Sequence, residues 1–369
     1  MEIRKNIYSV RAVDSEIRIF HGYQTPIGTT YNAYLAVDDK VTLIDFVKAR
    51  FAGDLIRNIK EILGDRPLDY IICNHVEPDH SGALPEIMRA YPSARIYGTA
   101  SCEKGLRAYY PGAEFAFSQV KLGDTLCAGE YTFSFLPMPM VHWPDSMATY
   151  LAREKILFSN DALGQHIGSG EMYDKDLPLE TLLDRAGDYY ANIVLPFGAQ
   201  VKKVLAAIGG LEIEMICPSH GVILRERIPQ MAGKYAEWCE NATREDKAVI
   251  VYDTMWGTTE KLARRLYDEY TGKGVGAEMI NLAEKHHSYA MARLLEAKYI
   301  FVGSPTLNNQ VMPSVAAFLT YMKGLKPKNR VGLAFGSYGW SGESVGQIDD
   351  ILKSCGFETL APVKALWNV

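Results

Sequence analysis

The chain has 369 residues, of which 48% are hydrophobic and 22% are charged, with a formal net charge of −5 at pH 7. At about 150 residues per domain, this length predicts two or three domains, and the composition excludes a disordered or low-complexity protein. The acidic balance disfavours a nucleic-acid-binding surface as the main function, so we expect no nucleic-acid partner.

Targeting signals and paired cysteines are not seen in the sequence. The start, Met1–Ile7, lacks the apolar core of a signal peptide, and no apolar run approaches the roughly 18 residues of a membrane span. The cysteines are scattered without a Cys-x-x-Cys pair, which argues against zinc ribbons and local iron–sulfur ligation. We therefore expect a reduced, cytoplasmic location and no membrane partner.

The first 220 residues mix strands and helices. Two β-rich runs, Thr30–Val37 and Val41–Val47, are separated by Asp38-Asp39-Lys40 and predict a hairpin. The next predicted elements are a helix at Leu55–Leu63, strands at Leu68–Cys73 and Arg95–Tyr97, and strand-like sequence over Tyr131–Phe158. Polar residues repeatedly follow these strands, which favours a layered α/β sandwich with a site along one sheet edge.

The pattern changes after the polar stretch Glu240–Asp246, where we place a domain boundary between residues 245 and 246. Beyond it, strands and helices alternate regularly, and the apolar runs Val249–Val251 and Tyr299–Val302 are typical of a parallel sheet buried on both faces. This alternation predicts a doubly wound fold. The predicted strands are Ala248–Tyr252, Ala277–Ile280, Lys298–Val302, Val331–Phe335 and Thr359–Val363, and the helices are Thr258–Tyr270, a segment near Met291, Pro313–Met322 and Glu343–Cys355.

A dense group of candidate metal ligands follows the strand that ends at Cys73. The segment Asn74–Gly82 reads Asn-His-Val-Glu-Pro-Asp-His-Ser-Gly and contains His75, Glu77, Asp79 and His80. Imidazole and carboxylate groups crowded at a strand end would go unpaired if buried, whereas a divalent metal satisfies both. A polar loop with a capped helix is the alternative interpretation. Three further candidates, each following a strand-like run, are His142, Asp161 and His220.

Three loops in the second half form a second constellation. The strand at Ala248–Tyr252 leads through Asp253–Thr259 directly into a helix, whose N-terminal amides can bind an anion. This segment resembles the phosphate loop of flavodoxins, which bind FMN. Two more loops, Gly303–Asn309 and Gly336–Gly342, follow later strands of the same sheet, where a doubly wound fold places its ligand. The predicted cofactor-binding residues are Thr254, Met255, Trp256, Gly257, Thr258, Thr259, Pro305, Thr306, Leu307, Asn308, Asn309, Ser337, Tyr338, Gly339, Trp340 and Gly342.

The order His-x-Glu-x-Asp-His, then His, Asp and His, resembles the metallo-β-lactamase-like domain of flavodiiron proteins, and the three loops resemble their flavodoxin-like domain. The resemblance covers nearly the whole chain. It implies an α/β protein with an N-terminal metallo-β-lactamase-like αββα sandwich over residues 1–245. It also implies a C-terminal flavodoxin-like doubly wound parallel sheet over 246–369, whose last helix is missing because the chain stops straight after the fifth strand.

The resemblance also implies an activity. One iron would be held by His75, Glu77 and His142, the other by Asp79, His80 and His220, with Asp161 bridging. Electrons from an external donor, such as a rubredoxin or another redox protein, would pass through FMN to these two non-haem irons, which reduce dioxygen to water or nitric oxide to nitrous oxide. A head-to-tail homodimer would bring the flavin of one chain beside the irons of the other, and Trp143 is a candidate for touching that flavin.

Two other functions fit parts of the pattern. A dinuclear zinc hydrolase with a flavodoxin-like appendage would share the ligand scaffold, but Glu77 stands where such hydrolases usually have His, and a carboxylate favours iron. A plain FMN electron carrier would keep the first domain metal-free. His166, five residues after Asp161, is either a residue of the metal pocket or a structural one.

Overall fold

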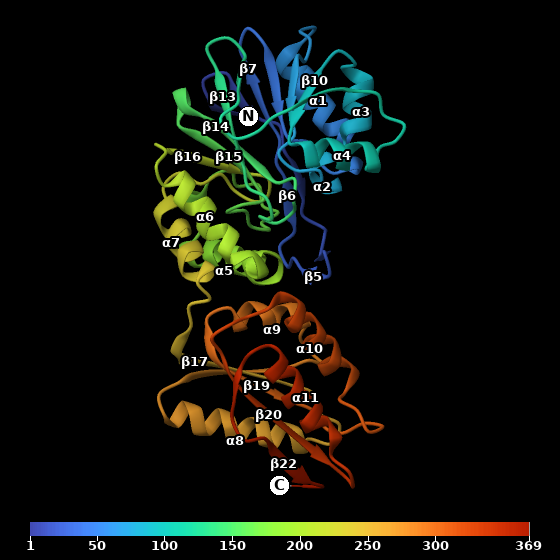
Figure 1. Ribbon diagram of the computed structural model, residues 1–369, viewed down its shortest axis with the longest axis vertical. Coiled ribbons are helices and arrows are strands. Elements are labelled where there is room, and N and C mark those ends of the chain that lie inside the picture. The colour runs from blue at the N-terminus through green and yellow to red at the C-terminus, as the bar shows by residue number, and fades with distance from the viewer. Residues whose placement is uncertain (369) are drawn as a thin grey trace. The chain divides into compact units, whose positions relative to one another are not determined.

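The computed structural model describes residues 1–368, which form two compact units. Unit 1 comprises Met1–Arg18, Thr25–Ala186 and Ala199–Tyr235, and unit 2 comprises Ile19–Gln24, Gly187–Gly198 and the chain from Ala236 onward. The labelled elements of both are shown in Figure 1. The predicted boundary between residues 245 and 246 falls inside strand β17 (Arg244–Tyr252) and stays a prediction.

The first sheet of unit 1 has seven strands in the spatial order β1-β2-β7-β8-β9-β10-β11. The strands from β1 to β8 are antiparallel and those from β8 to β11 parallel. The antiparallel β7–β8 pair confirms the predicted hairpin. Its first strand is shorter than predicted, because residues 29–31 leave this sheet as β6 and pair with β3. The bounds are β1 (Glu2–Arg4), β2 (Ile7–Ser9), β3 (Ala12–Asp14), β6 (Thr29–Tyr31), β7 (Tyr34–Val37), β8 (Val41–Ile44), β9 (Tyr70–Ile72), β10 (Arg95–Gly98) and β11 (Ala116–Gln119).

The second sheet of unit 1 has five strands in the order β12-β13-β14-β15-β16. It is antiparallel except for β16, which runs parallel to β15. The bounds are β12 (Thr125–Cys127), β13 (Thr132–Pro137), β14 (Met147–Leu151), β15 (Ile156–Asn160) and β16 (Met215–Pro218). The predicted strand-like stretch Tyr131–Phe158 therefore contains two complete strands and most of a third.

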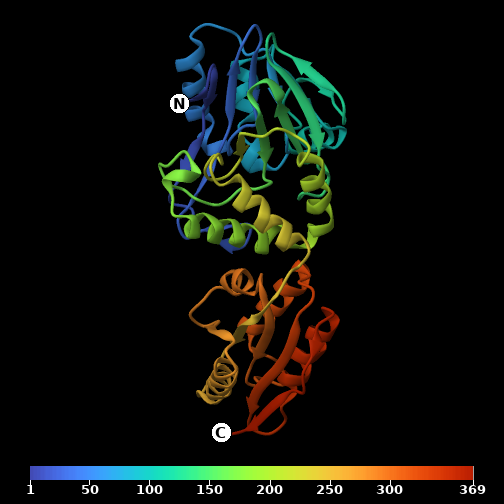
Figure 2. The same ribbon diagram turned by 90° about the vertical axis from the view of Figure 1, so that its left-hand side faces the viewer.

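The core of unit 1 lies between the two sheets. Ile44 and Ile72 of the first sheet and Phe133 and Phe158 of the second belong to one buried apolar cluster. Helices cover the outer faces (Figures 1 and 2), which confirms the αββα sandwich. The bounds of the helices in this part of the chain are α1 (Ala52–Leu63), α2 (Pro78–Ser81), α3 (Leu84–Ala90), α4 (Ala100–Tyr109), α5 (Leu179–Tyr189), α6 (Gly198–Ile208) and α7 (Ile228–Cys239). In α1 the buried residues recur at helical spacing, which is why this segment forms an amphipathic helix.

The sheet of unit 2 is parallel throughout, with the order β18-β17-β19-β20 followed by β21 and β22, both beside β20. This is the flavodoxin-like order. Helix α8 packs against one face through a shared apolar cluster, and Figure 2 shows other helices on the opposite face. The bounds are α8 (Thr258–Gly272), β18 (Gly276–Asn281), α9 (His287–Leu294), β19 (Ala297–Gly303), α10 (Pro313–Leu325), β20 (Val331–Tyr338), α11 (Glu343–Ser354), β21 (Glu358–Thr359) and β22 (Val363–Leu366).

The last strand differs from its prediction. Thr359–Val363 was expected as one strand, but the pairing with β20 stops after Thr359 and resumes at Val363. Pro362 lies in the gap, and proline has no N–H to donate to a sheet ladder. The fifth strand position is therefore filled by two short strands.

One helical run is long and apolar enough to cross a membrane by length and composition alone. It covers Leu179–Ile208 and joins α5 and α6 through a π-helical turn at Tyr190–Val194 and a 3-10 turn at Leu195–Phe197. No pattern in the sequence predicted this run. Tyr189 and Tyr190 are almost completely buried, although only 33% of the apolar window of the run is buried. A single helix that qualifies by length and composition is weak evidence for a membrane span.

Candidate metal and flavin sites

The seven predicted metal-ligating residues come together in unit 1. His75 follows β9, Glu77 caps the N-terminal end of α2, and Asp79 and His80 lie within α2. The other three lie at one end of the second sheet: His142 between β13 and β14, Asp161 directly after β15, and His220 two residues after β16. All seven are buried, the most exposed being 8% accessible. Neighbouring strand ends thus bring together residues that are up to 145 positions apart (220 − 75) in the sequence.

The seven residues form two groups, each able to surround one metal ion. The first contains His75, Glu77, His142 and Asp161, and the second Asp79, His80 and His220, with ligand atoms within 4.8 Å of one another in each group. Asp161 reaches both groups. Its Oδ2 lies 3.1 Å from His142 Nε2 and 3.6 Å from His75 Nε2, while its Oδ1 lies 2.9 Å from His80 Nε2 and 3.5 Å from His220 Nε2.

Buried polar atoms of the second group, together with the Asp161 oxygen that faces it, fit a bound cation. Within residues 1–368, both carboxylate oxygens of Asp79, both ring nitrogens of His80 and Oδ1 of Asp161 make no hydrogen bond. A buried polar atom without a hydrogen bond costs about 1–3 kcal/mol, and more if it is charged. A metal ion supplies the missing interaction for carboxylates and imidazoles together, so the donor set fits metal.

Neighbouring groups orient two of the histidines. His75 Nδ1 lies 3.0 Å from Asp145 Oδ2, and His220 Nδ1 lies 2.7 Å from the carbonyl oxygen of Thr30. Both partners are acceptors, so each Nδ1 carries a proton and donates it, leaving the Nε2 lone pair directed at the cluster. Asp145 also accepts from the backbone N–H of Val76 at 2.7 Å.

The charged groups of the cluster shift one another's pKa values. Burial lowers the pKa of His80, but the charges of Asp79 and Asp161 outweigh it and raise this pKa to about 9. Burial likewise opposes ionisation of Asp161, yet the charge of His80 and a hydrogen bond with His142 hold its pKa well below its ordinary value. Asp79, whose pKa is also lowered by His80 and His220, and Asp161 are therefore ionised at neutral pH, and a metal would replace the histidine protons that otherwise neutralise them.

A buried carboxylate behind the cluster was missed by the sequence analysis. Asp45, directly after β8, accepts hydrogen bonds from the N–H and Nδ2 of Asn74 at 2.7 and 3.0 Å and from Asn160 Nδ2 at 3.2 Å. Asn74 precedes His75, and Asn160 Oδ1 accepts from the N–H of Asp161 at 2.8 Å. Asp45 thus ties together the strand ends of both sheets. The sequence signal that could have identified Asp45 is its position directly after a strand, because the predicted metal ligands also follow strands.

The rings of His166 and Trp143 lie beside the cluster. The ring of His166 is buried, 4.5 Å from that of His220, with its Nδ1 2.6 Å from Thr29 Oγ1. The ring of Trp143 packs 5.2 Å from that of His75. Both rings therefore lie next to candidate metal ligands.

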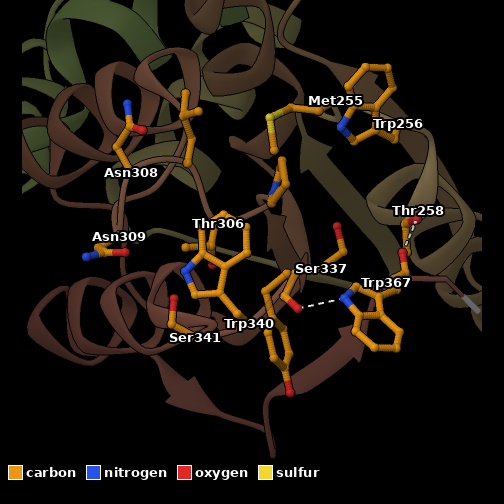
Figure 3. Close-up of a pocket in the computed structure, with 14 residues that line it drawn as sticks. Met255, Trp256, Thr258, Thr306, Asn308, Asn309, Ser337, Trp340, Ser341 and Trp367 are labelled. Carbon is orange, nitrogen blue, oxygen red and sulfur yellow. Dashed lines mark hydrogen bonds between the residues drawn. The ribbon is translucent and has the colours of Figure 1, made fainter.

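Unit 2 contains a cavity of about 400 Å³ at the ends of β17, β19 and β20. Figure 3 shows side chains from all three predicted loops around it. Most of the predicted residues line the cavity: Met255, Trp256, Thr258, Pro305, Thr306, Leu307, Asn308, Asn309, Ser337, Tyr338, Gly339 and Trp340. The other predicted residues lie in the loops without lining it: Thr254, Gly257, Thr259 and Gly342. Ser341 and Trp367 line it and were not predicted.

Hydrogen bonds within and between the loops hold the walls of this cavity in place. Gly257 has a φ of +80° directly before α8, and its N–H donates to Thr254 Oγ1 at 3.1 Å. The Thr258 hydroxyl donates to the carbonyl oxygen of Trp367 at 2.8 Å (Figure 3). The indole N–H of Trp367 in turn donates to the carbonyl oxygen of Gly339 at 2.7 Å (Figure 3). The N-terminal end of helix α8, with its backbone N–H groups, thus faces a cavity that contains hydroxyl groups and aromatic rings. This combination suits a ligand in which a phosphate is joined to a flat ring.

A metallo-β-lactamase-like sandwich with a two-metal donor set, followed by a flavodoxin-like sheet with a ligand cavity, defines a two-domain oxidoreductase. Residues 29–221 match the family described as ODP family beta lactamase, and residues 250–367 match the flavodoxin family.

The chain is 42% identical to a nitric oxide reductase of Moorella thermoacetica, over 97% of this chain and 91% of that protein. Two solved structures match with TM-scores of 0.97 each. One is rubredoxin oxygen:oxidoreductase from Desulfovibrio gigas, 39% identical, covering 100% of this chain and 93% of that chain. The other is the flavodiiron protein from Giardia intestinalis, 32% identical, covering 100% and 91%. The chain belongs to the flavodiiron protein family.

Proposed function

We propose that this protein reduces dioxygen to water, nitric oxide to nitrous oxide, or both, with electrons supplied by a separate redox protein. The observation that carries the proposal is the pair of metal-binding groups joined by Asp161, each of whose oxygens faces one group. The names of the relatives support both gases, since one is a nitric oxide reductase and another acts with oxygen and rubredoxin.

We propose that the metals are iron, with His75, Glu77 and His142 holding one, Asp79, His80 and His220 holding the other, and Asp161 bridging. Glu77 provides a hard carboxylate in the first group, which favours iron over zinc. When bound, the two irons and FMN would supply the electron storage and the open coordination positions that reduction of a diatomic gas requires.

The residues of the chain have separate tasks in this scheme. Asp145 and the Thr30 carbonyl hold the rings of His75 and His220 in the orientation that directs Nε2 at the metals. In unit 2, the N-terminal end of α8 would bind the FMN phosphate, and the loops with Asn308 and Tyr338 would surround the flavin ring. We place this flavin beside the metals of a second copy in a head-to-tail homodimer, against Trp143.

The electron donor is proposed to be a rubredoxin or another small redox protein, and the location to be the cytoplasm. Within residues 1–368 the six cysteines form no disulfide. Their spacing offers no iron–sulfur ligand set of the chain's own. The name of the Desulfovibrio gigas relative supports a rubredoxin donor.

Metal analysis followed by gas turnover tests the function. We expect about two irons and one FMN per chain, and consumption of dioxygen or nitric oxide by the anaerobically reduced protein, measured in parallel with electrodes for each gas. Asp161→Ala should lose both the iron and the turnover, while Asp65→Asn, at an exposed site, should keep both. About two zinc ions with no iron, together with thioester or lactam hydrolysis, would establish the hydrolase alternative instead. Inertness toward both gases would refute the proposal.

A further inference from the structure

A tight turn between β19 and α10 forms part of the wall of the cavity in unit 2. Leu307 and Gln310 exchange two backbone hydrogen bonds of 2.9 Å, and Asn308 and Asn309 between them have φ values of +51° and +59°. Two central residues in the left-handed region are typical of a type I′ turn, and asparagine tolerates this region better than most residues. Asn308 and Asn309 both line the cavity (Figure 3). The position of the turn therefore shapes the cavity on this side.

Helix α11 contacts this turn through the side chain of Gln347. Its Nε2 donates to the carbonyl oxygen of Asn309 at 3.0 Å, and its Oε1 accepts from the N–H of Val311 at 3.2 Å. The opposite orientation of the amide would place donor against donor and acceptor against acceptor, so only this orientation makes both bonds. One carboxamide thus pairs with the backbone of residues 309 and 311 in the way that a neighbouring strand would.

The support from Gln347 is separate from the other contacts of this segment. Within residues 1–368, Gln347 is the one side chain that hydrogen-bonds to the backbone of residues 307–311. The flanking residues are fixed elsewhere, because the N–H of Thr306 donates to the carbonyl oxygen of Ser337 and the N–H of Met312 donates to Ser304 Oγ, each at 2.9 Å. Gln347 does not line the cavity. Its influence on a ligand there must therefore pass through the turn.

We propose that Gln347 is a positioning residue for the flavin, an inference that rests on the FMN binding proposed above. By fixing residues 309 and 311 to α11, its carboxamide holds the turn at Asn308 and Asn309 in the conformation that surrounds FMN. The cavity is then formed before the cofactor enters it. A preformed site loses less conformational freedom on binding and so binds its ligand more tightly.

FMN titration tests this role without relying on turnover. The full-length chain, loaded with metal and freed of FMN, is titrated with FMN and followed by flavin fluorescence. Gln347→Met keeps the length of the side chain and loses both bonds, whose usual net strength corresponds to about 5- to 150-fold, so we expect the Kd for FMN to rise at least about fivefold. Asp350→Met places the same residue at an exposed position of α11 and should keep the Kd within about twofold. An unchanged Kd for Gln347→Met would overturn the proposal.

A third variant separates positioning of the turn from general loosening of unit 2. In Gln347→Glu the acceptor for Val311 remains, but a donor to Asn309 is present only while the carboxyl group is protonated. Residues 304–312 include no charged side chain that would stabilise the carboxylate, and the carbonyl oxygen of Asn309 raises its pKa above the ordinary value.

The readout for Gln347→Glu is its Kd for FMN divided by that of the unmodified protein at the same pH. This ratio should fall at least about threefold as the pH is lowered from 8 to 5, because the protonated side chain regains the second bond. A ratio that does not change with pH would refute the positioning role. Normal FMN binding without turnover of either gas would refute only the proposed reduction, whereas an unmodified chain that binds no FMN would refute both.

Discussion

The hydrogen bonds of Asp145 permit a quantitative prediction about metal retention. Its Oδ2 accepts from both His75 Nδ1 and the N–H of Val76, and the residue is buried. Hydrogen bonds to a charged group contribute about 1.5–3 kcal/mol each, so Asp145→Ala should lower the free energy of unfolding by about 3–6 kcal/mol. Loss of a partner that orients a ligand also weakens metal binding about 10- to 100-fold, which equals about 1.4–2.7 kcal/mol.

Asp145→Asn is the matched variant, because both bonds end on the same oxygen. The amide oxygen of asparagine can take that place and accept both bonds, though without the charge, so we expect it to recover most of the stability and metal binding. The assay is iron content after dialysis against graded concentrations of a competing chelator, with thermal unfolding of the same samples. If Asp145→Ala retains iron as well as the unmodified protein does, the orienting role is refuted.

Three further predictions concern packing, pH and metal removal. A Cβ at Gly303 would lie 2.2 Å from the ring of Phe335, so Gly303→Ala should destabilise unit 2 by about 1–3 kcal/mol in urea unfolding and weaken FMN retention, while Gly346→Ala, where a Cβ meets nothing within 4 Å, should not destabilise. Burial raises the pKa of Tyr131 from 10.0 to about 12, so the folded state keeps a proton that the unfolded chain loses. Stability should therefore fall as pH rises from 10 towards 12, and Tyr131→Phe should make the fall in melting temperature less steep; an unchanged slope would contradict this. Chelation should lower the melting temperature, because each metal at 100 times its Kd contributes about 2.7 kcal/mol, and an unchanged value would argue against resident metal.

The candidate metal site could be predicted from the sequence because its densest part is local. Four of the seven residues lie between His75 and His80, and the rest each follow a strand, so the sheet edge brings them together. Asp45 shares with the ligands only its position after a strand, and its contacts with Asn74 and Asn160 are not encoded in any sequence spacing. The same holds for the contacts of Asp145 with His75 Nδ1 and the N–H of Val76.

In unit 2 the order of strands and helices followed directly from the alternation of apolar runs. The missed cavity residue Trp367 is placed by long-range hydrogen bonds to Thr258 and Gly339, which a local pattern does not contain. The interruption at Pro362 was readable in principle, since proline seldom sits inside a paired strand. The long helical run between Leu179 and Ile208 was missed as a whole.

The position of Asp161 has a consequence for how the protein acquires its metals. Because one carboxylate oxygen faces each group, a first ion bound to Asp161 would fix the rotamer of that side chain and leave its second oxygen facing the neighbouring position. A first ion would also displace protons from the histidines of its own group. If iron fills both groups as proposed, we expect cooperative loading, so that at substoichiometric iron the population would divide into chains with two ions and chains with none, with few holding one.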